Sequence, residues 1–246
     1  MIDRFIFTAM TGAKHAMGQL ANNAHNMANV QTPGFREVLS TFRGVAVNGA
    51  SADSRSFVVD SVPGWNHSPG PVTMTDNPLD VALQGLGFFA VLRSDGTEAY
   101  SRSGRFTIDP DGFLRNMNGL QLVGEGGPIQ MPEGAHSVRI RHDGGVYAVV
   151  GSDSEPSKID HLKLVNPVPQ DVWRADDGLF EGMQPLEHDD SVRLITRSLE
   201  QSNVNLPQAM VDMIKQNRLF ELNLRLVQAA EQNARNAGGL LSLSRV

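Results

Sequence analysis

The residues of this chain that could carry chemistry are few and scattered. Closely spaced carboxylates occur at Asp109 and Asp111, at Asp176–Asp177 and at Asp189–Asp190. The run Asp-Pro-Asp-Gly that begins at Asp109 resembles the start of a calcium-binding loop, but no glutamate follows where such a loop needs its bidentate ligand. His188 adjoins the last carboxylate pair, yet no HxxxH or HExxH helix accompanies it, so a metal ion would bind there only opportunistically. Hairpin turns and solvated loops explain these runs better.

Signature motifs of the common enzyme classes are missing from the sequence. It has no GxSxG motif, no P-loop, and no GxGxxG between a strand and a helix. Gly85-Leu86-Gly87 precedes an expected strand, so it does not predict a phosphate loop. Cysteine is absent, which excludes disulfides, thiolate metal sites and cysteine nucleophiles. Trp65 and Trp173 are isolated, and packing in a core or an interface explains them. We therefore expect no catalysis, no cofactor and no metal.

Composition bounds the class of protein. The chain has 246 residues, 40% hydrophobic and 20% charged, so it can bury a core in one or two domains. Its net charge of −6 is uneven, because residues 1–43 and 197–246 are each +2 and the middle is −10. This distribution argues against nucleic-acid binding, which needs a concentrated basic face. No apolar run is long enough for membrane insertion, and the N-terminal residues lack a secretory signal pattern, which alone favours cytosolic residence.

The two ends of the chain share one apolar pattern. Residues recur at alternating steps of four and three, the a/d spacing of a coiled-coil seam. The N-terminal set is Ile6, Met10, Ala13, Met17, Leu20, Ala24 and Met27, and the C-terminal set is Leu206, Met210, Met213, Asn217, Phe220, Leu224, Val227, Glu231, Ala234, Gly238 and Leu241. We expect helices over 3–31 and about 206–237. Thr32-Pro33-Gly34 ends the first, Asn205 caps the second, and Gly238-Gly239 ends it.

Polar residues interrupt both helical patterns. Asn22, Asn26 and Asn29 share one side of the first helix, because their spacing is four and three. They indicate either a ladder of amides that bonds to adjacent chains or a frayed last turn, since asparagine is a poor helix former. Asn217 and Glu231 occupy seam positions in the second helix, where polar residues set register rather than affinity.

Between the two ends the apolar period changes to two. Leu79, Val81 and Leu83 alternate with other residues, and Phe88–Leu92 has the composition of a buried strand. Short apolar runs flank five turn pairs that predict antiparallel hairpins, Asp95-Gly96, Asp111-Gly112, Asn118-Gly119, Asp143-Gly144 and Asp177-Gly178. We expect strands over 79–93, 97–108, 112–117, 120–123, 137–141, 145–150 and 160–165, with a last one in 190–200. That number suffices for a small barrel or sandwich.

These patterns predict an α+β fold. Each terminal helix needs a coiled-coil partner, either the other helix or a neighbouring chain, and a mostly antiparallel β domain lies between the two helices in sequence. The predicted segments are an axial helix in 1–35, an extended connector or arm in 36–78, the β domain in 79–200 and a second axial helix in 201–246. The connector is too long for an ordinary loop, and Phe57-Val58-Val59 is a strand candidate within it.

Four segments of the sequence resemble the bacterial flagellar rod and hook proteins. Residues 26–35 (NMANVQTPGF) resemble the N-terminal signature of that family, and residues 79–89 (LDVALQGLGFF) the first strand of its central domain. Residues 100–106 (YSRSGRF) resemble the next hairpin, and residues 199–205 (LEQSNVN) the entry to its C-terminal helix. The match is closest to the proximal rod proteins. The alternative is the distal rod protein, which usually has Asn-Gly where this chain has Pro33-Gly34.

The resemblance implies a structural subunit of the flagellar basal-body rod that polymerises through its terminal helices into the hollow shaft used in motility. The N- and C-terminal helices would pair as a coiled-coil layer, the innermost layer of the rod, with the β domain outside. Implied partners are other rod subunits, copies of itself, the export apparatus and an export chaperone. Type III export would deliver it to the periplasmic span without a cleaved signal peptide, which overrides cytosolic residence. The expected polymer-interface residues are Ile6, Met10, Met17, Leu20, Asn26, Asn29, Met210, Met213, Phe220, Leu224 and Val227.

Two other functions fit parts of the pattern. An enzyme built on a small β barrel with helical dimerisation ends would need a polar pocket with perturbed carboxylates, and the sequence offers no such group. A free periplasmic binding or scaffold module would need a signal peptide. We expect instead that loosely ordered terminal helices become ordered when polymerisation buries their seams.

Overall fold

The chain folds into two compact units in a computed structural model that describes residues 2–40, 42–46, 56–60, 64–151, 155–168 and 170–243. The first unit comprises Met1–Ala28, Val38–Pro63 and Asn205–Val246, and the second comprises Asn29–Glu37 and Gly64–Val204. Each unit therefore joins segments that are distant in the sequence. The division of the sequence into four segments stays a prediction, because the two units are defined by spatial contacts and not by continuous stretches of sequence.

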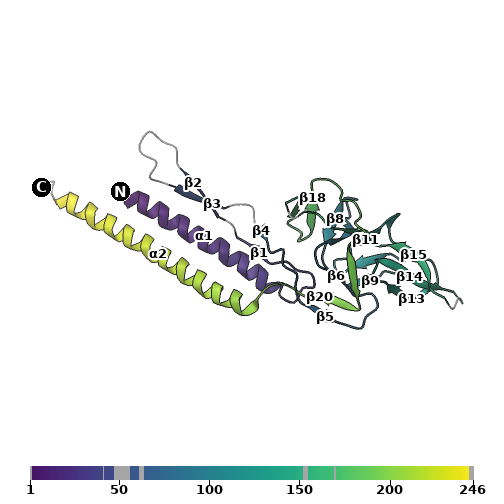
Figure 1. Cartoon of the computed structure of the whole chain (residues 1–246). Helices are drawn as coiled ribbons and strands as arrows, with labels where there is room; N and C mark the ends of the chain where they lie inside the picture. The colour runs from purple at the N-terminus through teal and green to yellow at the C-terminus, as the bar shows by residue number, and fades with distance from the viewer. Residues whose placement is uncertain are drawn as a thin grey trace. The chain divides into compact units, whose positions relative to one another are not determined.

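The first unit is built on two helices, α1 (Ile2–Ala28) and α2 (Leu206–Leu243). They lie side by side and run in opposite directions, so that the start of α1 is at the same end of the pair as the end of α2 (Figure 1). Strand β1 (Val38–Leu39) also belongs to this unit, as does the antiparallel pair of β2 (Phe42–Ala46) and β3 (Ser56–Asp60). The strand candidate at Phe57–Val59 is confirmed.

The helix boundaries differ from the predicted ones at both C-terminal ends. Helix α1 ends at Ala28, three residues before the predicted end, and the next residues form turns. Helix α2 begins where expected, and Asn205 caps it by accepting a hydrogen bond at Oδ1 from the backbone N–H of Gln208 at 3.2 Å. The predicted end at Gly238-Gly239 is wrong, because the helix continues through both glycines to Leu243. Glycine in a helix costs only about 1 kcal/mol relative to alanine, so it does not force an end.

The second unit contains a nine-stranded sheet in which every pairing is antiparallel. Its main path is β17 (Val172–Arg174), β18 (Phe180–Gly182), β8 (Glu98–Ser101), β7 (Phe88–Leu92), β11 (Gln121–Gly124), β10 (Leu114–Asn116) and β9 (Phe106–Ile108). Strand β12 (Gly127–Pro128) pairs with β11, and β16 (Leu164–Val165) with β7. The mostly antiparallel β domain is thus confirmed.

Smaller antiparallel groups complete the second unit. A three-stranded sheet contains β13 (Ala135–Ile140), β14 (Gly145–Val150) and β15 (Ser157–His161). Two-stranded pairs form between β19 (Arg193–Thr196) and β6 (Val81–Gln84) and between β20 (Ser198–Glu200) and β5 (Val72–Met74). Strand β4 (Gly64–Trp65) also lies in this unit.

Strand β7 is buried on both of its faces. Phe89 and Val91 belong to the larger apolar cluster, which also includes Phe106, whereas Phe88 and Ala90 belong to a second cluster with Tyr100. Successive side chains of a strand point to opposite faces. The unbroken apolar run of this strand therefore follows from burial on two sides.

All five predicted turn pairs lie in hairpins. Their glycines have φ between +78° and +94°, a backbone conformation that residues with a Cβ rarely adopt. Each glycine N–H donates to the carbonyl three residues earlier, as in Gly96 to Arg93 at 3.0 Å. Local backbone chemistry therefore specified these connections.

Several predicted strands are divided in the structure. The predicted strand 79–93 is two strands, because Gly85 and Gly87 have φ of +87° and +128°. The predicted last strand, 190–200, is likewise divided at Arg197, whose φ is +55°. The range 97–108 also forms two strands, and the short strands β5, β17 and β18 were not predicted.

Candidate functional site

The contact between α1 and α2 is made by small residues. Ala9, Ala13 and Ala16 of α1 are at most 8% exposed, as is Ala209 of α2. Small side chains allow two helix backbones to approach closely. A Cβ added to Gly12 would lie 2.7 Å from Asn223 Oδ1, which shows how little space remains.

A buried amide fixes the register of the two helices. Asn23 is 8% exposed, and its Nδ2 donates to the backbone carbonyl of Ala209 at 2.6 Å and lies 3.5 Å from Gln216 Oε1. A buried polar group that must find its partner favours one register over its neighbours. We expected this role for Asn217 and Glu231, but both are exposed.

Every second residue of the predicted seams, from Ile6 to Met27 and from Leu206 to Val227, is buried or half-buried. Ala234 is exposed, and the side chains of Gly238 and Leu241 lie outside the described residues. Buried or half-buried residues recur at steps of three and four along one side of each helix: Ile6, Ala9, Ala13, Ala16, Leu20, Asn23 and Met27 in α1, and Leu206, Ala209, Met213, Gln216, Phe220, Asn223, Val227 and Ala230 in α2. Met10 and Met17 were expected on this seam but are 54% and 62% exposed. Each follows a buried alanine by one residue, a step of about 100° around the helix.

Both helices also carry exposed apolar side chains, which we call the helix stripe. Its members are at least 42% exposed and include four of the expected interface residues: Phe7, Met10, Met17, Met210, Val211, Ile214, Leu219, Leu222, Leu224 and Leu226. Five other expected residues, Ile6, Leu20, Met213, Phe220 and Val227, are half-buried in the helix pair. Exposed apolar patches of this kind mark interaction sites.

The asparagine amides of α1 bond within their own chain. Asn26 exchanges two hydrogen bonds with the backbone of Val38, each 2.9 Å long, and is 5% exposed. Asn22 Nδ2 donates to Ser40 Oγ at 2.7 Å. Asn29, which belongs to the second unit, accepts a hydrogen bond from the Thr32 hydroxyl at 3.2 Å. At Asn22 and Asn26 the ladder thus ties the chain that follows α1 back onto the helix.

In the second unit, a buried ion cluster joins three of the sequence motifs. Arg36, Arg102 and Glu200 are each 2% exposed. Arg36 Nη2 lies 2.9 Å from Glu200 Oε1, and Arg102 donates to Glu200 Oε2 from both Nε, at 3.0 Å, and Nη2. The Gly70 N–H donates to Oε1 at 2.9 Å. The carboxylate thus accepts hydrogen bonds on both of its oxygens.

Burial changes the acid–base chemistry of this ion cluster. Burial and then the neighbouring charge of Arg102 lower the pKa of Arg36 to about 10, while Glu200 opposes the change. Burial also lowers the pKa of Arg102, again against the effect of Glu200. The cost of removing two guanidinium groups from water therefore exceeds what one carboxylate returns.

Backbone contacts add to the link between these motifs. The Gly34 N–H donates to the Glu200 carbonyl at 2.8 Å, and Gly34 has a φ of +72°. Asn203 Oδ1 accepts a hydrogen bond from the Glu37 N–H at 2.7 Å, and its Nδ2 donates to the Ser68 carbonyl at 2.8 Å. The segment that follows α1 and the segment that precedes α2 are therefore held together in the second unit.

Sequence reasoning missed all three ionic residues of this cluster. Each lies in or beside a quoted motif: Arg36 follows Phe35, Arg102 is in YSRSGRF and Glu200 is in LEQSNVN. That position within the motifs was the signal that could have indicated them. Arg102 and Glu200 are 98 residues apart in the sequence, and no local pattern reveals that they pair.

The predicted chemical candidates have structural roles. Asp109 accepts hydrogen bonds from the Phe113 N–H, at 2.7 Å, and from Arg115, within the hairpin between β9 and β10. Asp177 pairs with Arg93 at 2.8 Å. The Ser191 N–H donates to Asp189 at 2.8 Å.

Among the residues that the structure describes, one group of side chains could hold a metal ion. Ligand atoms of Glu125, His161 and His188 lie within 4.8 Å of one another. However, both ring nitrogens of His188 have partners, because Nδ1 accepts from the Leu164 N–H at 3.1 Å and Nε2 lies 3.1 Å from Asp190 Oδ1. A metal would have to displace one of these contacts.

The two tryptophans differ in environment. Trp65 packs in the second apolar cluster, with ring centroids 5.9 Å from Phe88 and 4.8 Å from Phe180. Trp173 is 40% exposed, and its Nε1 donates to Glu181 at 3.1 Å. Core packing is confirmed for the first.

The fold has three features that are typical of a self-assembling structural subunit. The two ends of the chain form a pair of helices, these helices carry exposed apolar side chains, and a β domain is inserted between them in sequence. Comparison with known proteins agrees with this class. The flagellar hook protein FlgE/F/G D1 domain matches residues 82–148, and the flagellar basal body rod FlgEFG protein C-terminal domain matches residues 196–240. The chain belongs to the family of flagellar basal-body rod proteins.

Relatives of two kinds align with the chain. The flagellar basal-body rod protein FlgF of Escherichia coli K12 is 40% identical over 99% of this chain and 100% of its own length. FlgF of Salmonella typhimurium LT2 is 39% identical over the same shares. FlgG of Buchnera aphidicola from Acyrthosiphon pisum is 28% identical over 85% of this chain and 88% of its own length. No described helix is both long and apolar enough to cross a membrane.

Proposed function

We propose that this chain is a structural subunit of the proximal rod of the flagellar basal body and has no catalytic role. The observation that carries the proposal is the full-length match to FlgF relatives at 40% identity. Its partners are other rod subunits and copies of itself. The shaft they build serves motility.

The two helices act as one inner layer of the rod. Their facing residues follow the alternating three- and four-residue steps of a coiled coil, which supports knobs-into-holes packing between them. The helix stripe remains exposed on the paired helices of one chain and is available to neighbouring subunits. The interface residues expected from the sequence then fall into two groups, those that hold the pair together and those that contact the next subunit.

Burial of the helix stripe drives assembly. Complete burial of one methionine or leucine side chain contributes about 1.5–3 kcal/mol. Several such residues per subunit offset the entropy lost when subunits are immobilised. Asn26 and Asn29 contribute by fixing the chain that leaves α1 rather than by bonding across subunits.

Delivery to the rod follows from this role. The subunit passes through the type III export apparatus, with an export chaperone as a further partner, and is incorporated in the periplasmic span of the basal body. An unfolded chain with no cysteine would pass between redox compartments without forming disulfides.

Imaging basal bodies from a strain whose only copy of this subunit carries a small tag tests the proposal. We expect tag density at the proximal end of the rod. Density at the distal end would favour the alternative, a distal rod protein, which the FlgG relatives at 28% identity keep in view. Absence of the tag from basal bodies of motile cells would refute both.

A further inference from the structure

The buried ion cluster of the second unit carries more positive than negative charge. Arg36 and Arg102 are both buried beside Glu200. Among the described residues, Glu200 is the carboxylate with which both guanidinium groups pair. A buried charge without a counterion is costly, because water cannot solvate it. The excess therefore needs a partner or must be neutralised.

One donor of the cluster is unused. Arg36 Nε has no hydrogen-bond partner among the described residues, although the side chain is 2% exposed. Its Nη1 donates to the Ser68 carbonyl and its Nη2 faces Glu200. By contrast, Arg102 donates from Nε to Glu200 and from Nη1 to the Gly87 carbonyl at 2.7 Å. The unmet donor is thus specific to Arg36.

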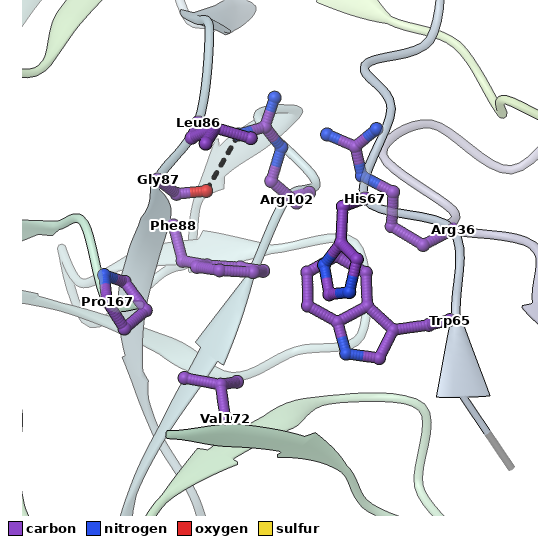
Figure 2. A pocket seen from close by; sticks show the side chains of 9 residues that line it. All are labelled: Arg36, Trp65, His67, Leu86, Gly87, Phe88, Arg102, Pro167 and Val172. Carbon is purple, nitrogen blue, oxygen red and sulfur yellow. Dashed lines mark hydrogen bonds between the residues drawn. The ribbon is translucent and has the colours of Figure 1, made fainter. Parts of the chain in front are cut away.

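A small cavity adjoins both guanidinium groups. Figure 2 shows the Arg36 and Arg102 side chains toward one end of it, and the His67 ring together with apolar side chains along the other walls. Its volume of about 20 Å³ accommodates one water-sized group, for which about 10–15 Å³ suffices. The lining residues are Arg36, Trp65, His67, Leu86, Gly87, Phe88, Arg102, Pro167 and Val172.

The walls supply no negative charge. None of the lining residues is an aspartate or a glutamate. Burial and then the charge of Arg36 lower the pKa of His67, which disfavours a competing cation on its ring. An occupant would therefore meet two guanidinium groups and an apolar surface.

We propose that this cavity binds one monovalent anion of the size of chloride, held by the Nε–H of Arg36 and the charge of both arginines. The small volume favours a monatomic ion over the larger sulfate and phosphate. A bound anion balances the excess charge and stabilises the link between the segment that follows α1 and the segment that precedes α2. The proposal concerns the second unit alone and does not depend on the role in the rod.

Anomalous diffraction from crystals of the full chain grown in sodium bromide tests the site directly. We expect one bromide peak in the cavity near Arg36. A cavity without such a peak, filled by water alone, would overturn the proposal.

Thermal unfolding gives a second readout in solution. Raising chloride from 5 to 300 mM, with ionic strength held constant by sodium sulfate, should raise the unfolding midpoint by about 3 °C. Arg36→Gln should lose this dependence, whereas the matched Arg93→Gln, which breaks exposed ion pairs with Asp177 and Glu181, should keep it. An equal chloride response in Arg36→Gln would also overturn the proposal.

Discussion

Replacing Glu200 with glutamine tests the buried ion cluster most strongly. The substitution keeps the size of the side chain but removes the charge that both Arg36 and Arg102 contact. It also places an amide N–H₂ where the carboxylate accepts hydrogen bonds from guanidinium groups and from the Gly70 N–H. Two buried cations then remain without their carboxylate partner.

The expected loss is large because the site is buried. Glu200 is 2% exposed, and removal of one partner from a buried ion pair costs about 3–5 kcal/mol. A typical domain has only about 5–15 kcal/mol of stability. We therefore expect Glu200→Gln to lower the urea midpoint of unfolding sharply. Tryptophan fluorescence can monitor this unfolding, because Trp65 lies beside Arg36 in the cavity wall.

A matched substitution at the surface provides the control. Glu181 pairs with Arg93 at 2.6 Å but is 31% exposed, so Glu181→Gln should cost no more than about 1 kcal/mol. Equal denaturant slopes in both variants would show that stability and not compactness changed. If Glu200→Gln costs no more than its control, the buried cluster does not stabilise this unit.

Two further predictions concern the second unit. Gly34→Ala should cost about 2–4 kcal/mol, because φ is +72° and a Cβ would lie 2.4 Å from a neighbouring backbone carbon. Gly96 has a φ of +83° but no atom close to an added Cβ, so the control Gly96→Ala should cost only about 1 kcal/mol. Similar urea midpoints for Gly34→Ala and Gly96→Ala would contradict the steric argument. Burial raises the pKa of Tyr100 to about 12. As the pH rises, the phenol ionises at a lower pH in the unfolded chain than in the folded chain. The stability that the neutral buried phenol contributes is therefore complete below pH 10 and falls by about 1.4 kcal/mol per pH unit up to pH 12. Tyr100→Phe loses the hydroxyl that accepts a hydrogen bond from the Leu186 N–H, so it should be less stable than the original chain at pH 8. Because phenylalanine does not ionise, this difference in unfolding free energy should shrink by pH 11. A difference that stays constant between pH 8 and pH 11 would contradict the raised pKa of Tyr100.

Elements specified by local chemistry were predictable from the sequence. The five glycine turns require positive φ, and the Asn205 cap needs only the neighbouring helix N–H groups. Strands β17 and β18 were missed because three residues are too few to show alternation, and they form only through pairing with each other and with β8.

The helix seam shows where a sequence pattern is ambiguous. Met10 and Ala9 are both apolar, so the pattern contains two stripes one residue apart. Packing distance selects the alanines for the contact between helices and leaves the methionines exposed. The ion cluster was beyond sequence reasoning for another reason, since it unites residues that are adjacent only after the chain has folded.

The most direct test of the proposed assembly is the incorporation of a Met17→Asp subunit into basal bodies. Met17 is 62% exposed, so the purified variant should keep its helicity and unfolding midpoint, while a carboxylate buried against the next subunit would cost several kcal/mol. Each 1.4 kcal/mol is a tenfold change in binding. Met183→Asp makes the same change at a position that is 86% exposed in the β domain. We predict at least tenfold less Met17→Asp than Met183→Asp subunit in basal bodies, with loss of swimming; equal incorporation and normal swimming would contradict assembly through the helix stripe.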